Sequence, residues 1–400
     1  MSDDSRMRWT PPDPQQLPEW RAELLEHLDA DSTKVTMREA LRAGRSTIVP
    51  TVPGIGASQG SVGALLLTAC ERRRLETAEL YYATPDMTAL ALAAAHTPPT
   101  EPVTLSRLPS ESGFIVFGEP IGGYTEDAGA ALANTPFGTP GASAQITTPI
   151  VAASWSVWTP REVTLDQGEV RWLYRGAGSA GTVPADWSGV WITFYSPRGL
   201  FSGLPPETVI GTMRDGMVMT AGMIDGLREA QGPPLGWDNE MLLREGAPFD
   251  TPVPDTTDRW AHVLYTAWQL MAQQGKNRWA EVDEIPRARA GAKRDRRQGV
   301  TGSSAVRVVR VHSAHRPTPQ AAQDDAQAST GRREPQWSCR WPVRPYRRST
   351  CMDPRAHAEG GCTHEDRIVS GHVKGPEGAP LRTGATVHLW DRQPTETAPD

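Results

Sequence analysis

Several features that would assign this sequence to a familiar class of protein are rare or missing. It has four cysteines in 400 residues, too few for the disulfide framework of a small secreted domain. It has no run of about 18 apolar residues, which a membrane-spanning helix requires. The first residues, MSDDSRMRWTPPDPQQ, lack the apolar segment of a secretory signal. These absences predict a cytoplasmic protein with no membrane partner.

Apolar residues are also scarce, at 38% of the chain, whereas glycine (37 residues) and proline (36 residues) are abundant. This composition is typical of a folded core that carries long irregular segments. A length of 400 residues suggests two domains, or one large domain with appendages.

The net charge of −6 is unevenly distributed along the chain. Residues 1–285 hold 21 basic and 35 acidic residues, and residues 286–400 hold 20 basic and 12 acidic residues. The first part therefore carries −14 and the second +8. An acidic body with a basic tail predicts a polyanion or an acidic surface as the partner of the tail. The alternative is a disordered linker whose arginines are simply solvated.

Hydrophobic periodicity predicts an α+β fold, in which one mainly antiparallel sheet is packed by a few helices. The clearest helix is 255–275, which begins at a threonine cap and carries Trp260, Leu264 and Trp268 along one apolar stripe. Shorter helices are expected at 17–30 and 32–44. Aromatic and β-branched residues predict strands at 113–121, 150–158, 169–175 and 189–197, the last three as an antiparallel meander, with a long loop at 122–149.

Composition divides the chain into five segments. We expect a disordered N-terminus (1–13), an α+β body (14–286), a mostly disordered linker (287–335) that contains a strand at 305–312, a small β-rich C-terminal module (336–392) and a disordered tail (393–400).

One short stretch matches a catalytic motif. Within GIGASQGSVG (54–63), the residues around Ser58 have the G-x-S-x-G pattern of a hydrolase nucleophile elbow, between an expected strand and an expected helix. The alternation of strands and helices that such hydrolases need is missing from the chain, however, and small residues produce the pattern easily by chance. The sequence therefore favours a flexible turn, with Ser58 as a weak alternative nucleophile.

Three cysteines and three histidines fall within residues 339–372. Zinc takes four nitrogen or sulfur ligands, commonly paired at short spacing. Cys362 with His364 would give one pair and Cys351 with His357 the other, and a metal would stabilise a small module that has little core. No C-x-x-C pair is present, so scattered surface thiols are the alternative.

The segment WSCRWPVRPYRR (337–348) interleaves aromatic residues with arginines. Aromatic rings stack on unpaired bases, and guanidinium groups bind phosphates. The alternative is a strand whose tryptophans pack inward while its arginines face water. The residues predicted to bind nucleic acid are Arg340, Trp341, Arg344, Tyr346, Arg347, Arg348 and, further along the chain, Lys374.

Several stretches resemble a family of uncharacterised proteins from actinobacteria, their phages and their integrative elements. They include ELYYATPDMTALALAA (79–94), LPSESGFIVFGEPI (108–121), DRWAHVLYTAWQLMAQ (258–273) and VRVVRVH (306–312). The tail, with a Trp-x-x-x-Trp-x-Val run from Trp337 and a Lys-Gly-Pro followed by Pro-Leu from Lys374, is the most specific part. The segment CMDPRAHAEGGCTHED (351–366) departs from that pattern. The resemblance implies a cytoplasmic protein of mobile or phage-derived DNA, and it assigns no catalytic residue.

The sequence thus supports one leading hypothesis, a non-catalytic protein that associates with nucleic acid through its basic, aromatic C-terminal module. The alternatives are a hydrolase-like enzyme that uses Ser58, and a structural or regulatory module that binds another protein. The oligomeric state stays open.

Overall fold

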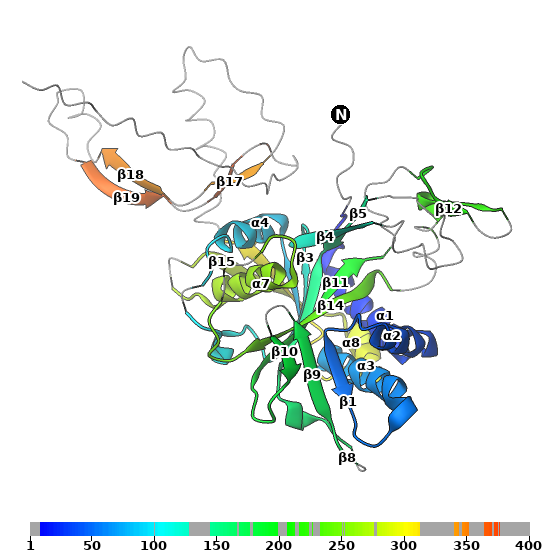
Figure 1. Ribbon diagram of the computed structural model, residues 1–400. Coiled ribbons are helices and arrows are strands. Elements are labelled where there is room, and N and C mark those ends of the chain that lie inside the picture. Colours follow the sequence, from blue (N-terminus) through cyan, green and yellow to red (C-terminus); the bar gives the residue numbers. More distant parts are fainter. Residues whose placement is uncertain are drawn as a thin grey trace, which may run out of the picture. The chain divides into compact units, whose positions relative to one another are not determined.

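The structure is a computed structural model of the 400-residue chain (Figure 1). It describes residues 9–99, 101–127, 145–165, 168–176, 179–198, 206–212, 216–223, 226, 233–249, 251, 253–275, 278–312, 340–343, 346–351, 364–369, 372–374 and 376. The chain divides into two compact units, Met1–Arg316 and Pro317–Asp400.

A seven-stranded sheet forms the centre of the first unit, in the order β14-β11-β6-β3-β2-β16-β15. Strands β14, β11, β6 and β3 pair antiparallel, β3, β2 and β16 run parallel, and β15 is antiparallel to β16. The predicted α+β class is confirmed. The strands are β2 (Glu79–Ala83), β3 (Ser112–Phe117), β6 (Ala152–Trp158), β11 (Gly189–Pro197), β14 (Leu235–Arg244), β15 (Ala280–Ile285) and β16 (Val306–Val311).

Helices cover both faces of this sheet. Because side chains alternate between the faces of a strand, Val190, Ile192 and Phe194 of β11 join a core with α7, and Tyr195 joins a second core with α1. Helices α4 (Pro85–Ala94) and α7 (Thr257–Ala272) cover the first face, and α1 (Leu17–Asp29) and α3 (Gln59–Thr77) the second (Figure 1). Helix α2 (Asp31–Arg42) packs on α3 and has no buried side chain.

The predicted helices form for the reasons that the sequence offers. In α7, the Thr256 hydroxyl accepts a hydrogen bond from the Arg259 backbone N–H, and Trp260, Leu264 and Trp268 are buried along one stripe. The expected helices at 17–30 and 32–44 are α1 and α2. No helix in the part of the chain that the structure describes is long and apolar enough to cross a membrane.

The predicted meander of three strands is wrong. The stretch 169–175 contains β9 (Arg171–Gly176), which pairs with β1 (Ile48–Thr51) and β10 (Ser179–Thr182) in a separate sheet. The indole of Trp172 explains why β9 lies in this sheet. Its ring centroid is 5.2 Å from that of Trp158 and 5.4 Å from that of Trp191, in a buried cluster of tryptophans. Aromatic packing thus places β9 in the smaller sheet.

Two segments predicted to be irregular contain regular structure. Within 122–149, β4 (Gly122–Asp127) pairs with β5 (Gln145–Ile150). The stretch 287–303, predicted to be disordered, contains helix α8 (Arg289–Arg297), and the strand expected at 305–312 is β16, an interior strand of the main sheet. Burial of Asp295, Val308 and Val309 attaches these residues to the first unit.

The remaining elements are short. They are η1 (Pro14–Gln16), η2 (Gly56–Ser58), η3 (Leu105–Arg107), η4 (Pro160–Glu162), the pair β7 (Thr164–Leu165) and β8 (Gly168–Glu169), and the pair β12 (Val209–Thr212) and β13 (Val218–Thr220). In the second unit, β17 (Trp341–Val343) pairs with β20 (His372–Lys374), and β18 (Tyr346–Cys351) pairs with β19 (His364–Val369).

Candidate functional site: a cavity beside a buried polar row

A row of polar residues crosses three strands of the main sheet. Thr193 of β11 lies between Glu240 of β14 and Ser154 of β6, and each is its direct cross-strand partner. All three side chains are buried. Partners in register share a face of the sheet, so the row lies on the face covered by α3. A buried polar row requires hydrogen-bond partners, because leaving such groups unsatisfied costs free energy.

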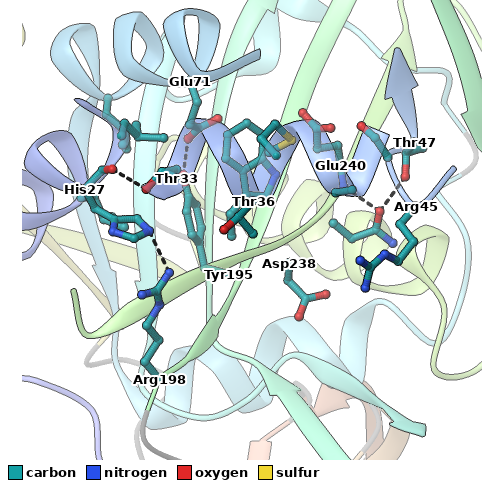
Figure 2. A pocket seen from close by; sticks show the side chains of 18 of the residues that line it. His27, Thr33, Thr36, Arg45, Thr47, Glu71, Tyr195, Arg198, Asp238 and Glu240 are labelled. Atoms are coloured by element: carbon teal, nitrogen blue, oxygen red, sulfur yellow. Dashed lines mark hydrogen bonds between the residues drawn. The ribbon is translucent and has the colours of Figure 1, made fainter. Parts of the chain in front are cut away.

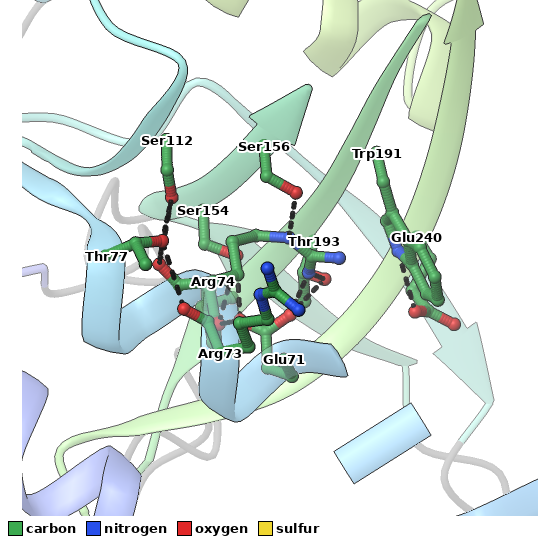
Figure 3. Close-up of polar contacts among 11 residues, drawn as sticks. Glu71, Arg73, Arg74, Thr77, Ser112, Ser154, Ser156, Trp191, Thr193 and Glu240 are labelled. Carbon is green, nitrogen blue, oxygen red and sulfur yellow. Dashed lines mark hydrogen bonds and ion pairs between the residues drawn. The ribbon is translucent and has the colours of Figure 1, made fainter. Parts of the chain in front are cut away.

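Glu71 of α3 supplies partners for one end of the row (Figure 3). Its Oε1 accepts hydrogen bonds from Ser154 at 2.7 Å and from the Tyr195 hydroxyl. Its Oε2 accepts from Thr193 at 2.7 Å and from Arg74, which is also its buried ion-pair partner. With four donors, the Glu71 carboxylate is fully satisfied. Burial and the adjacent negative charge hold the pKa of Tyr195 well above its usual value, so its hydroxyl stays a donor.

Glu240 occupies the other end of the row and is less well satisfied. Its Oε1 accepts a hydrogen bond from the Trp191 indole N–H at 3.0 Å (Figure 3). No residue in the described ranges donates to Oε2, although the side chain is only 4% exposed. Desolvation by burial raises the pKa of Glu240 to about 8, against an opposing effect of the Arg74 charge. Glu240 is therefore mostly protonated at neutral pH.

A cavity of about 450 Å³ opens beside these two carboxylates (Figure 2). Its size falls within the range of small-molecule sites. Sheet residues and α3 form one side, and α1, α2 and the start of β1 form the other. The lining combines apolar walls with polar groups; it comprises Leu24, His27, Leu28, Ser32, Thr33, Thr36, Met37, Ala40, Arg45, Ser46, Thr47, Glu71, Leu75, Tyr195, Arg198, Trp237, Asp238, Asn239 and Glu240.

Strand β14 contains a β-bulge beside the cavity. Phe194 pairs with Asn239 and Tyr195 pairs with Trp237, so the register shifts by one residue and inserts Asp238. In a regular strand successive side chains point to opposite faces, and a bulge redirects one of them. The four residues from Trp237 to Glu240, which include the bulge, all line the cavity.

His27 and Arg198 stand at the opposite side of the cavity from Glu240, whereas Arg45 lies on the Glu240 side (Figure 2). The Arg198 guanidinium donates to Nε2 of His27 at 2.9 Å. Burial, together with the Arg198 charge, lowers the pKa of His27, so the imidazole is neutral near pH 7 and can accept this bond. The Thr33 hydroxyl donates to the backbone carbonyl of His27 and connects α2 to α1.

Ser58 is the last residue of η2, one position before α3, and it is exposed. The strand before it, β1, belongs to the small antiparallel sheet and not to a parallel one. Within the described ranges no histidine or carboxylate is hydrogen-bonded to the Ser58 hydroxyl. The geometry gives the hydrolase hypothesis no support here.

The residues predicted to bind nucleic acid are only partly described. The β17–β20 register sets Trp341 opposite Lys374, and Lys374 is exposed. Tyr346, Arg347 and Arg348 belong to β18, Arg340 precedes β17, and Arg344 lies outside the described residues.

The residues predicted to bind zinc are also only partly described. The β18–β19 register pairs Cys351 with His364, whereas His357 and Cys362 lie outside the described residues. No group of three potential metal-ligating side chains gathers within the ranges that are described. Zinc binding by these four residues stays a prediction.

The division into two units changes the charge distribution expected from the sequence. Residues 286–316 hold nine basic residues and one acidic residue, whereas residues 317–400 hold eleven of each. The positive charge assigned to the tail therefore belongs to α8, β16 and their flanks, which are part of the first unit. The second unit has no net charge.

Helix α8 presents much of this charge to solvent. Its exposed cations are Arg289, Lys293, Arg294, Arg296 and Arg297. None of the five forms an ion pair with any residue that the structure describes. On its inner side, Asp295 is buried between Arg21 of α1, at 3.9 Å, and Arg287, at 3.4 Å. These contacts fix the helix with its cations outward.

Reasoning from the sequence alone did not identify the two buried carboxylates. Glu71 stands in the run CERRRLET, which reads as a charged helix face, and its donors come from β6 and β11, 83 to 124 positions later. The one sequence signal for a buried polar group was the stretch WITFY, in which Thr193 stands among the apolar and aromatic residues of a buried strand.

Comparison with protein-family models, with curated proteins and with solved structures gives no match for this chain. Its function must therefore be inferred from its own residues.

Proposed function

We propose that this protein associates with nucleic acid, without catalysis, and that the exposed face of α8 is its main phosphate-binding surface. The observation that carries the proposal is the set of five exposed cations on α8, which have no carboxylate partner in the described part of the chain. Cations that are not neutralised within the protein are available to replace the counterions of a phosphate backbone.

The arrangement of α8 favours a polyanion over a small anion. The cations Arg289, Lys293 and Arg297 recur every fourth residue, so they form one stripe along the helix. Nine residues span about 13 Å, which is longer than a single phosphate group. Glu19 and Glu26 of the neighbouring α1 are already engaged by Arg287 and Gln298. The stripe itself is left unopposed.

The C-terminal module is a second contact in this proposal. Aromatic residues and arginines within 337–348 suit stacking on unpaired bases. Because the second unit has no net charge, its contribution is expected to be smaller than that of α8 and to favour single strands. A cytoplasmic location, as the sequence predicts, would give access to nucleic acid.

Binding of the full chain to fluorescently labelled single- and double-stranded DNA of about 20 nucleotides tests the proposal, by anisotropy over a range of salt. The α8 variant replaces Arg289, Lys293, Arg294 and Arg297 with Gln. Each lost phosphate contact should reduce the slope of log K against log salt by roughly 0.9 on duplex, so the variant should lose most of the salt dependence and bind at least ~10-fold more weakly.

A matched control replaces four exposed arginines away from α8, namely Arg161, Arg171, Arg175 and Arg244. It removes the same charge, so equal weakening by both variants would show a nonspecific effect of net charge and contradict the proposed surface. A third variant, with Arg340, Arg344, Arg347 and Arg348 changed to Gln, measures the contribution of the tail. Absence of binding by the unaltered chain at about 50 mM salt, where phosphate contacts are strong, would refute the function.

A further inference from the structure

A carboxyl oxygen at the cavity beside the polar row has no hydrogen-bond partner among the described residues. Glu240 is buried, its Oε1 is occupied by Trp191, and its Oε2 receives no hydrogen bond from any described residue. An unpaired oxygen on a carboxyl group that is otherwise buried is costly unless another group meets it. Glu240 lines the cavity, so the missing partner can arrive from there.

Two arginines bear on Glu240, and neither is paired with it. Arg45 lines the same cavity and forms no hydrogen bond or ion pair with Glu240. Arg74 acts on the Glu240 charge, but the Arg74 guanidinium donates to Glu71, to Thr193 at 2.8 Å and to Ser156 at 3.3 Å. The Arg74 guanidinium also lies over the Trp191 ring, 4.7 Å from its centre. It is therefore committed to the neighbouring carboxylate.

The other walls determine what kind of group fits. Leu24, Leu28, Met37 and Leu75 are aliphatic, and the half-buried Trp237 adds an aromatic surface. A metal ion requires several oxygen or nitrogen ligands together, and no such group gathers within the described residues. An organic cation, by contrast, combines a charged nitrogen with a carbon skeleton that these walls can bury.

We propose that this cavity is a binding site for a small organic amine, whose cationic nitrogen contacts Oε2 of Glu240 while its carbon chain lies against the aliphatic and Trp237 walls. This site is separate from the α8 surface, and neither proposal depends on the other. Helix α2 forms one wall of the cavity and has no buried side chain, so a ligand meets little packing on that side.

Binding of an amine should release a proton from the protein. Burial raises the pKa of Glu240 to about 8, so at pH 7 the carboxyl is mostly neutral before the ligand arrives. A cation against Oε2 favours the ionised form. Affinity should therefore increase ~5-fold as the pH rises from 7 to 8, and level off above pH ~9 until the amine itself deprotonates near pH ~10.

The first experiment titrates the full chain with n-hexylamine and with 1-hexanol, which has nearly the same shape and no charge. Isothermal titration calorimetry in two buffers of different ionisation enthalpy gives the affinity and the number of protons released. We expect hexylamine to bind at least ~10-fold more tightly than hexanol at pH 8, a difference of about 1.4 kcal/mol, and to release close to one proton at pH 7.

Variants show whether Glu240 and the cavity are responsible. Glu240→Gln keeps the shape and should abolish both the preference for the amine and the proton release. Glu245→Gln removes an exposed carboxylate of the same chain outside the cavity and should change neither. Ala40→Phe fills the cavity from α2 without touching Glu240 and should weaken both ligands, and near-ultraviolet circular dichroism checks that each variant is folded.

Three results would overturn the proposal. They are equal affinity for hexylamine and hexanol, amine binding that survives Glu240→Gln, and affinity that falls between pH 7 and pH 8. The last would mean that the protonated Glu240 donates to a neutral acceptor instead of receiving a cation.

Discussion

Glu71 and Glu240 lie at the two ends of one polar row, yet their surroundings differ. Glu71 receives four hydrogen bonds and pairs with a buried arginine. Glu240 receives one, from an indole, and its second oxygen has no donor among the described residues. The same residue type thus occurs in a closed network and, one strand beyond Thr193, in an incomplete one beside a cavity.

The difference indicates a structural role for Glu71 and a ligand-binding role for Glu240. A buried carboxylate with all its lone pairs satisfied holds elements together and has nothing to offer a ligand. A buried carboxyl with a free oxygen, a raised pKa and an adjacent cavity has the properties expected of a functional group. Three substitutions test how buried carboxylates act in this protein, and they differ in the size of the expected effect.

Glu71→Ala should have the largest effect. It leaves Arg74 charged and buried, and it removes the acceptor for Ser154, Thr193 and Tyr195. Breaking a buried ion pair in this way costs about 3–5 kcal/mol. Urea unfolding followed by tryptophan fluorescence measures the loss. A decrease below ~1 kcal/mol would show that the network does not hold α3 to the sheet.

Asp295→Ala should have an intermediate effect, because its ion pair is less complete. The Arg21 pKa is lowered to about 10, mainly by burial, but Arg21 also donates to the carbonyls of Ala78 and Ser303. We expect a loss of about 2–3 kcal/mol, with α8 released first. Hydrogen exchange at the α8 amides detects that release, and faster exchange across all helices would contradict a local role.

Glu240→Gln should have the smallest effect of the three near pH 5, and this effect should grow as the pH rises. The raised pKa means that the folded protein holds a proton which the unfolded chain loses above its pKa of 4.5. Wild-type stability therefore falls as the pH rises from 4.5 to about 8. The glutamine variant lacks this loss, so it should nearly match the wild type near pH 5 and exceed it by a margin that grows up to about pH 8. Urea unfolding at both pH values measures the difference, and a pH-independent difference would place Glu240 in an ionised, satisfied state.

Much of the fold was predictable where local signals suffice. The threonine cap and the tryptophan stripe of α7 act within one helix, and β6 and β11 carry the aromatic and β-branched residues that strands favour. Residues 287–303 were wrongly predicted to be disordered, because their composition resembles that of a disordered linker. Helix α8 is held by Asp295 and its contact with Arg21, a residue 274 positions earlier. No local pattern encodes that pairing.

The cavity was not predictable for the same reason. Its lining comes from six separate stretches between Leu24 and Glu240, and the bulge that inserts Asp238 into β14 appears only in the pairing of β11 with β14. The G-x-S-x-G motif around Ser58 arises because small residues precede the start of a helix. Its geometry gives no support to a nucleophile there. The excess of basic residues after residue 285 exists as counted from the sequence. Residue 285 lies inside the first folded unit, however, and does not mark the border between the two units.

The position of β16 also has a consequence for biosynthesis. This strand pairs with β2 on one side and β15 on the other, and β2 precedes it by more than 220 residues. At ribosomal rates of roughly 5–20 residues per second, the β2 edge waits on the order of ten to fifty seconds for its partner. During translation the nascent chain therefore exposes an unpaired apolar strand edge, and we expect the newly made protein to depend on a chaperone until residue 311 has emerged.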